Sequence, residues 1–235
     1  LHDALPIWEV VFTDGIDLQA GPAGSVAYYG LQNVNIDSSY FSQSNVTVGR
    51  DARAQHYATV FGGMFAKHRV DLTMAGPGSD GFLGGVYFPL EDQHVDLRTV
   101  QKHASDHAHS DTLFKGAVMD EAHTVYQGLI DVDRTAIQTD AYLTNNNLLL
   151  SDEAQADSIP TLQINTDDVR CSHGSTTGKL DQAQVFYLKT RGYSEQEAQR
   201  ILVEGYFEAV LERYPDTILE EIHELLRTRI TRDSE

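Results

Sequence analysis

The stretch LFKGAVMDEAHTVYQGLIDV, residues 113–132, carries the pattern that decides the fold. Val118 and the pair Ile130/Val132 belong to short apolar runs whose members flank polar residues. Alternation of this kind, with a period of two, predicts half-buried β-strands. Gly116 and Gly128 punctuate the stretch, as is typical of bends and bulges in strands.

The same pattern extends over residues 24–168 and gives the chain an internal repeat. The alternating runs are Val34/Ile36, Val46/Val48, Val70/Leu72/Met74, Val95/Leu97, Ile130/Val132 and Leu162/Ile164. Counted at Val34, Val46, Val70, Val95, Val118 and Ile130, they lie 12, 24, 25, 23 and 12 residues apart. A step of about two dozen residues fits a coil with two main sheets per turn, which is a β-helix. An antiparallel sandwich, whose strands recur every ~8–12 residues, fits the residues equally well.

After residue 180 the period becomes helical. Asp181 predicts a capped helix that runs to Arg191, with Gly192 as its stop. Ser194-x-x-Glu197 is a capping box for a second helix, which we expect Pro215 to end. We expect this helix to present Ala198, Ile201, Leu202, Gly205 and Ala209 on one face.

A third helix is expected to start at Thr217-x-x-Glu220, with Ile218, Ile222, Leu225 and Leu226 on one side. The sequence therefore predicts a β body over residues 1–178 and a small helical domain over residues 179–235. The first seven residues, LHDALPI, precede the patterned region, and we expect them to be unrelated or truncated sequence.

Composition excludes several classes of function. Acidic residues outnumber basic residues 35 to 17, so the formal charge is −18 and nucleic-acid binding is disfavoured. Few of the bases are lysines, which suggests a surface adapted to high salt. There is no run of ~20 apolar residues, so we expect no membrane span. The single cysteine predicts no internal disulfide and a cytoplasmic location, and one cysteine cannot hold a four-cysteine cluster.

The segment CSHGSTTGKL, residues 171–180, contains the strongest candidate chemistry. It is not a phosphate loop, because Gly174 and Gly178 enclose three residues instead of four and Leu180 replaces the hydroxyl residue. We expect its glycines and Lys179 to form the turn into the first helix. Cys171 and His173 are two residues apart, so in an extended segment both face the same way and could ligate iron. A buried cysteine beside a hydrogen-bonded histidine is the structural alternative.

The histidine-rich segment KHASDHAHSD, residues 102–111, matches no fixed metal-ligand spacing. We interpret it as a polar turn whose histidines contact backbone or solvent. The abundant carboxylates single out no catalytic pair, so a polysaccharide-cleaving β-helix enzyme is a weak alternative.

The run from Thr139 to Val210 closely resembles the C-terminal region of the SufB/SufD family of iron–sulfur cluster assembly proteins. Its most specific pieces are NNNLLLSDEA, IPTLQINTDDVRCSHG and VFYLKTRG, and weaker similarity extends upstream to about residue 90. The resemblance implies a right-handed parallel β-helix core followed by a C-terminal helical domain. It also implies that an N-terminal segment of the family is missing from this sequence.

The family resemblance implies partners and a role. Members are scaffold subunits without catalytic activity of their own; SufB and SufD pair through their β-helices, and each docks one SufC ATPase through its helical domain. A nascent Fe-S cluster then forms transiently at the SufB–SufD interface, and a reduced flavin is associated with the assembled complex. On the helices, Tyr206, Phe207 and Val210 are candidate exposed positions for SufC, although each could equally belong to the core.

Two departures from SufB indicate a SufD-like chain. Ala154 stands where SufB-like chains carry an acceptor cysteine, and Gly174 stands where they carry a glutamate. The SufD-type interface histidine maps onto His173, with Cys171 alongside, and both are expected as transient iron ligands. Asp167, Asp168 and Arg170 match the motif and are expected to be structural. Self-pairing, or a purely structural platform that contributes no ligand, remain the alternatives.

Overall fold

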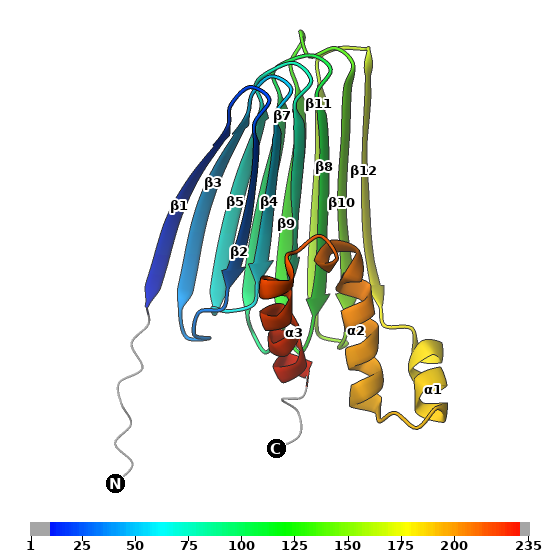
Figure 1. Ribbon diagram of the computed structural model, residues 1–235. Helices are drawn as coiled ribbons and strands as arrows, with labels where there is room; N and C mark the ends of the chain where they lie inside the picture. The colour runs from blue at the N-terminus through cyan, green and yellow to red at the C-terminus, as the bar shows by residue number, and fades with distance from the viewer. Residues whose placement is uncertain (1–9, 231–235) are drawn as a thin grey trace.

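The computed structural model describes residues 10–230 as a β-solenoid followed by three helices (Figure 1). The expectation for LHDALPI lies outside these residues. Odd-numbered strands form one six-stranded sheet, here called sheet A: β1 (Val11–Ala20), β3 (Ser39–Val48), β5 (Phe65–Met74), β7 (His94–His103), β9 (His123–Val132) and β11 (Gln155–Ile164). Even-numbered strands form the second, sheet B: β2 (Ser25–Gln32), β4 (Arg53–Val60), β6 (Asp80–Tyr87), β8 (His109–Val118), β10 (Thr139–Leu149) and β12 (Val169–Lys179).

Every neighbouring pair of strands in both sheets is parallel. The chain therefore passes from sheet A to sheet B and back, and each turn of the coil contributes one strand to each sheet. This confirms the predicted parallel β-helix, and it excludes the antiparallel sandwich that the residues alone left open.

The turn of the solenoid is longer than the sequence step predicted. Ser39 lies opposite Phe65 and His123 lies opposite Gln155, so the turns that these pairs define hold 26 and 32 residues. The predicted step of two dozen was wrong because the counted residues are not equivalent positions; Val34, for example, lies in the loop between β2 and β3.

The core is built from inward-facing rows that run across the turns. In sheet A one such row contains Val46, Leu72 and Ile130, which are all essentially inaccessible to solvent. Because every inward side chain stacks on its equivalents in the neighbouring turns, the interior is filled by a single elongated apolar cluster. The rows end at the first and last turns, where stacking partners are present on one side only.

The three helices are α1 (Gln182–Thr190), α2 (Glu195–Leu211) and α3 (Asp216–Ile230). Asp181 caps α1 by accepting a hydrogen bond from the Ala183 N–H, and the capping box of Ser194 and Glu197 opens α2, both as predicted. Pro215 had been expected to end α2. That helix already ends at Leu211, and Pro215 precedes the first residue of α3 and accepts two of its N–H groups through its carbonyl.

The expected apolar face of α2 is confirmed at Ala198, which is buried, and is wrong in the second half of the helix. Gly205 and Ala209 are exposed, whereas Val203, Phe207 and Val210 are buried. Larger side chains gain more from burial than glycine or alanine, so they determine which side of the helix packs on the solenoid. For α3, the predicted face is confirmed at Ile222 and Leu226.

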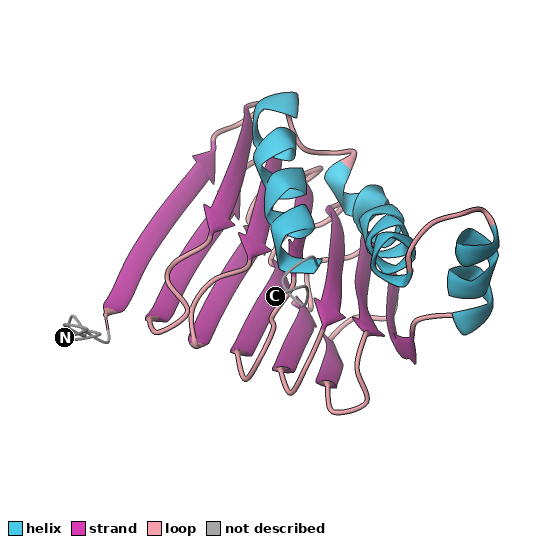
Figure 2. Ribbon diagram, turned by 90° about the horizontal axis from the view of Figure 1, so that it is seen from below, coloured by secondary structure: helices cyan, strands magenta, loops and turns pink. Residues whose placement is uncertain are grey.

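The helices cover sheet B and leave the outer face of sheet A open (Figure 2). Apolar residues of β4 and β6 form one buried cluster with residues of α2 and α3. Polar contacts reinforce it: Arg229 of α3 donates to the carbonyls of Phe61 and Phe88, and Lys115 of β8 donates to the Tyr206 carbonyl over 2.6 Å. The helices are therefore anchored to several turns of the solenoid at once.

Candidate functional site

The candidate site lies at the end of the solenoid formed by β11 and β12. Each of these strands has a parallel partner on one side only, β9 for β11 and β10 for β12. Their residues are consequently exposed or half-buried, whereas alternate residues of β10 are fully buried. A strand edge of this kind offers unpaired backbone N–H and C=O groups to another strand.

The register places Cys171 and His173 on the inward rows of this last turn. Cys171 lies opposite Ala141 and His173 lies opposite Leu143, and both partners are buried in the core. Because side chains alternate along a strand, Cys171 and His173 share the inward face, as their spacing predicted. Within the described chain no further turn covers them, so His173 is exposed while Cys171 is half-buried against the core.

The strand opposite provides the other half of this open end. The inward positions of β11 are half-buried and mostly apolar, and they include Pro160 and Leu162; at the end of the strand Ile164 is exposed. Ser158 lies on the same row, and its hydroxyl is buried without a hydrogen-bond partner. The uncovered end of the solenoid therefore presents an apolar half from β11 and a half from β12 that carries a thiol, an imidazole and hydroxyl groups.

The environment of Cys171 keeps its thiol protonated. Burial raises the pKa of the Cys171 thiol above its ordinary value, and the nearby Asp140 carboxylate raises it further. A thiol must lose its proton to ligate a metal, so this cysteine would bind iron with release of a proton. It is therefore not poised as a nucleophile in the isolated chain.

Cys171 and His173 do not form a metal site by themselves. In the part of the chain that the structure describes, no three His, Cys, Asp or Glu side chains form a group that could hold a metal ion. A pair of ligands needs two further donors to complete the tetrahedral coordination that is usual for thiolate-ligated iron and zinc. Iron or sulfide bound here would thus need ligands from outside this chain.

The neighbouring motif residues lie around the turn that leads into β12. The backbone carbonyl of Asp168 accepts a hydrogen bond from the Gln138 N–H over 2.6 Å, which links two successive turns. Asp167, Asp168 and Arg170 line a depression of about 410 Å³ at this corner. The structural role expected of them stays a prediction.

The segment after His173 was expected to form a turn, and this was wrong. Gly174, Gly178 and Lys179 all belong to β12, which runs as an extended strand to Lys179 before the helices begin. Extension is favoured because each residue pairs in register with β10. Lys179 forms an ion pair with Asp152, so its charge is compensated by this chain.

The histidine-rich segment forms a turn between β7 and β8, as predicted, with one exception, His103. His103, the last residue of β7, is fully buried and hydrogen bonds to the Ser110 hydroxyl over 2.8 Å. His107 adopts a positive φ of 55°, so it does not share an extended face with His109. His107 pairs with Asp106 instead, at 3.1 Å.

On the helices, two of the three candidate residues belong to the core, which was the alternative left open for them. Phe207 and Val210 are completely buried in the cluster shared with sheet B, and Tyr206 is half-buried with the Lys115 ammonium 4.6 Å from its ring centre. The exposed aromatic side chains are those of Phe186 and Tyr187 on α1, together with Tyr193 between α1 and α2. They belong to the run VFYLKTRGY, whose density of aromatic residues on a short polar helix could have signalled a surface patch.

Comparison with known proteins agrees with this architecture. Residues 9–206 match the family described as SUF system FeS cluster assembly, SufBD core domain. An iron-sulfur cluster assembly SufBD family protein of Mycobacterium leprae is 32% identical over 210 residues, which cover 86% of this chain and 54% of the relative. Iron-sulfur cluster assembly protein SufD of Escherichia coli is 34% identical over 179 residues, covering 76% of this chain and 42% of that protein.

The chain thus spans about half the length of the curated relatives it matches. Among its described helices, none is long and apolar enough to cross a membrane.

Proposed function

This chain belongs to the SufBD core family of the SUF iron–sulfur cluster assembly system, and on that basis we propose that it is a SufD-like scaffold subunit. In this role it pairs with a SufB-like subunit, recruits a SufC-like ATPase and helps a nascent Fe-S cluster to form at the interface. ATP hydrolysis belongs to the partner. The observation that carries the proposal is the position of Cys171 and His173 on the uncovered inward face of the last turn.

Pairing is proposed through the end formed by β11 and β12. A partner β-helix that presents a similar end would extend both parallel sheets, because both edges lie at the same end of the solenoid. It would also bury the apolar residues Leu162 and Ile164, which have no turn above them in the described chain. Either a SufB-like subunit or a second copy of this chain meets these requirements.

The chemical contribution proposed for this chain is a pair of ligands. A thiolate and an imidazole are suitable donors for iron, and the interface would supply the remaining donors from the partner. Because burial and the nearby Asp140 carboxylate raise the pKa of the Cys171 thiol, binding of iron by this cysteine would release a proton. The cluster is the cargo of this site, assembled there and passed on.

The ATPase is proposed to dock on the helical segment. Phe186, Tyr187 and Tyr193 form an aromatic group exposed on and next to α1, on the side of the molecule that holds the helices. Aromatic side chains of this kind are enriched at protein–protein interfaces. These residues replace Phe207 and Val210 as the proposed contact.

The proposal is tested by reconstituting the complex with His173→Ala. Cluster formation is expected to fall at least about tenfold, because loss of even an outer-shell partner of a metal ligand typically costs about 10–100-fold in metal affinity, while the subunits still assemble. The matched control is His107→Ala, an exposed histidine in a turn far along the chain from β12. Wild-type levels of cluster formation with His173→Ala would contradict the proposed ligand role and would favour the alternative, a rigid platform that aligns its partners and contributes no ligand.

A further inference from the structure

The outer face of sheet A carries a groove that the proposed function does not use. It has a volume of about 390 Å³ and crosses β5, β7, β9 and β11. We call it the arginine groove and define it by Arg69, Arg98, Val100, Leu129 and Ile159; threonines, glutamines and a glycine complete its lining. No helix covers this face (Figure 2), so the groove is open to solvent.

The lining has the opposite charge to the molecule as a whole. The chain has 35 acidic and 17 basic residues, yet the ten lining residues include two arginines and no carboxylate. The register explains how the arginines come together: Arg69 lies directly opposite Arg98 on the adjacent strand. At physiological ionic strength, charges more than about 8 Å away are largely screened, so the local arginines dominate the field in the groove.

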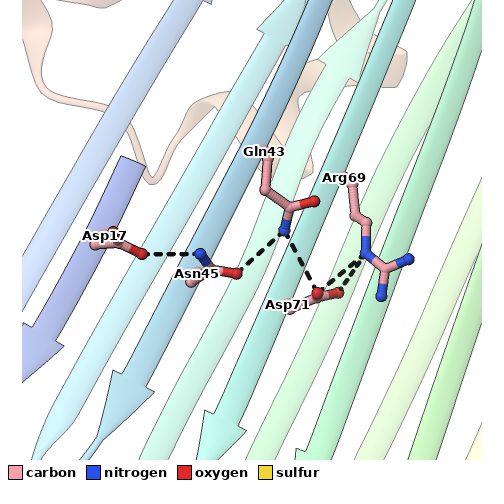
Figure 3. Close-up of polar contacts among 5 residues, drawn as sticks. All are labelled: Asp17, Gln43, Asn45, Arg69 and Asp71. Carbon is pink, nitrogen blue, oxygen red and sulfur yellow. Dashed lines mark hydrogen bonds and ion pairs between the residues drawn. The ribbon is translucent and has the colours of Figure 1, made fainter. Parts of the chain in front are cut away.

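In both arginines the Nε atom of the guanidinium group donates to a carboxylate, whereas the two Nη atoms are free of such contacts in the described part of the chain. Arg69 uses Nε to donate to both carboxylate oxygens of Asp71, at 3.1 and 3.0 Å. Arg98 likewise uses Nε, with Asp96 at 3.2 Å. Among the described residues, the Nη atoms of these two arginines have no hydrogen-bond partner, and Figure 3 shows those of Arg69 pointing away from Asp71.

The carboxylates beside the groove do not neutralise it fully. Asp96 is shared, because Lys67 also donates to it over 2.8 Å, so one carboxylate serves two cations. Burial alone would raise the pKa of Asp96, but the hydrogen bonds from Lys67 and Arg98 outweigh it and lower the pKa. Three cations therefore surround the two carboxylates of Asp71 and Asp96.

The floor of the arginine groove is apolar. It begins where a row of hydrogen-bonded polar side chains on the outer face of sheet A ends. On the first strands of sheet A, Asp17, Asn45 and Gln43 form a chain of hydrogen bonds that ends at Asp71 and Arg69 (Figure 3). The next positions in the row of Asp71 are Val100 and then Leu129. Ile159, on the neighbouring row, is 50% exposed.

We propose that the arginine groove binds a small organic anion. Its acidic group, a carboxylate or a phosphate ester, is held by the free Nη atoms of the two arginines, and its apolar body lies on the three aliphatic side chains. The volume falls in the range of small-molecule sites, and planar guanidinium groups suit both kinds of acid. This binding site is independent of the cluster-assembly role and lies on a different face from the helices.

The experiment is a calorimetric titration of the chain with three probes: 2-naphthyl phosphate, 2-naphthoate and the uncharged 2-naphthalenemethanol. Both anions are expected to bind saturably, at least about tenfold more tightly than the alcohol, because charge-assisted hydrogen bonds are worth more than neutral ones. Tighter binding of the phosphate would identify phosphate esters as the ligand class, and tighter binding of the naphthoate would identify carboxylates.

Variants locate the binding. Arg98→Gln is expected to weaken both anions about tenfold, and Leu129→Glu to weaken them at least as much by placing a carboxylate in the floor. The control is Lys102→Gln, on the same strand and face but paired with Asp131 and Asp133 outside the groove; it is expected to change affinity less than twofold. The proposal is overturned if the anions bind no better than the alcohol, or if the double variant Arg69→Gln/Arg98→Gln binds them like the wild type.

Discussion

Several buried positions of the solenoid carry polar residues where their row is otherwise aliphatic. Gln101 lies between Leu72 and Ile130, and it accepts a hydrogen bond from the Ser110 hydroxyl while its amide donates to the Tyr142 carbonyl. His103 joins the same group through Ser110. A buried polar side chain is tolerated when it is hydrogen-bonded, as Gln101 and Ser110 are here, whereas the Nδ1 atom of His103 has no hydrogen-bond partner among the described residues.

The buried histidines predict that the fold loses stability in acid. Burial lowers the pKa of His56, His68 and His103 to about 4, whereas an unfolded histidine titrates near 6.5. Their contribution is therefore complete above pH 6.5 and is lost as the pH falls toward 4. Each histidine should reduce the free energy of unfolding by roughly 1.4 kcal/mol per pH unit in this window.

This prediction is checked by urea unfolding between pH 7 and pH 4. His103→Gln, which cannot take up a proton, should show a shallower loss than the wild type over that range. His107→Gln, whose side chain is exposed, is the control and should follow the wild-type curve. Equal slopes for all three proteins would show that the buried histidine is not the source of the acid sensitivity.

A Gly→Ala substitution is expected to have opposite effects on stability at two glycines of sheet B. A methyl group on Gly85 of β6 would lie 1.9 Å from the Ala58 carbonyl oxygen, so the neighbouring strand would have to move. Gly174 of β12 has nothing within 4 Å. We expect Gly85→Ala to cost about 1–3 kcal/mol and Gly174→Ala to be neutral or slightly stabilising, as measured by chemical denaturation; equal effects would contradict the described packing.

At the scale of elements, the sequence predicted the helices better than the turns of the solenoid. Caps are local, so Asp181 and the Ser194–Glu197 box located α1 and α2 correctly. The length of a solenoid turn is set by which residues stack on one another in neighbouring turns. Because the loops between the strands differ in length, this register could not be predicted from the sequence. The spacing alone predicted that Cys171 and His173 share one face of a strand; it could not predict that this face points inward or that the two residues lie on the last described turn.

The face of α3 was predicted correctly, whereas the face of α2 was predicted incorrectly in its second half for a related reason. Which side of α2 is buried depends on the surface of sheet B, where the helix packs in one cluster with Tyr57 and Phe82. The helix alone gives no indication of that surface. The same long-range packing buries Phe207 and leaves Phe186 exposed.

These two phenylalanines make a matched pair for stability. Phe207 is completely buried between α2 and sheet B, so Phe207→Ala should destabilise the chain by about 3–5 kcal/mol. Phe186 is 68% exposed, and Phe186→Ala should change the free energy of unfolding by less than about 0.5 kcal/mol. Thermal or urea unfolding of both variants measures these effects. A small effect of Phe207→Ala would mean that the helices do not pack as described.

The exposed aromatic group makes a separate prediction about the ATPase. The double variant Phe186→Ala/Tyr187→Ala should bind a SufC-like partner at least about tenfold more weakly, as expected when interface aromatic anchors are truncated. Ser172→Ala, on the exposed face of β12, is the control and should bind normally. Affinity that is unchanged in the double variant would place the docking surface elsewhere.

At the scale of the whole molecule, the solenoid, the helices and the candidate site form a connected arrangement. Arg229, Lys115 and the shared apolar cluster tie the helices to sheet B, and β12 leads from the candidate site directly to α1. Eleven residues of continuous strand therefore separate the turn before Cys171 from the helical segment. A partner that moves the helices would therefore also move the solenoid, including the edge strand β12 that carries Cys171 and His173.

The most direct test of the account is to find what lies against Cys171 in the assembled complex. This is the single cysteine of the 235 residues, so a maleimide-linked benzophenone can be attached there alone and irradiated after mixing with a SufB-like subunit and a SufC-like ATPase. We expect cross-links to the β-helix of the SufB-like subunit, or to a second copy of this chain. Cross-links to the ATPase alone, or none in a complex that has assembled, would contradict the proposal that β11 and β12 form the pairing face.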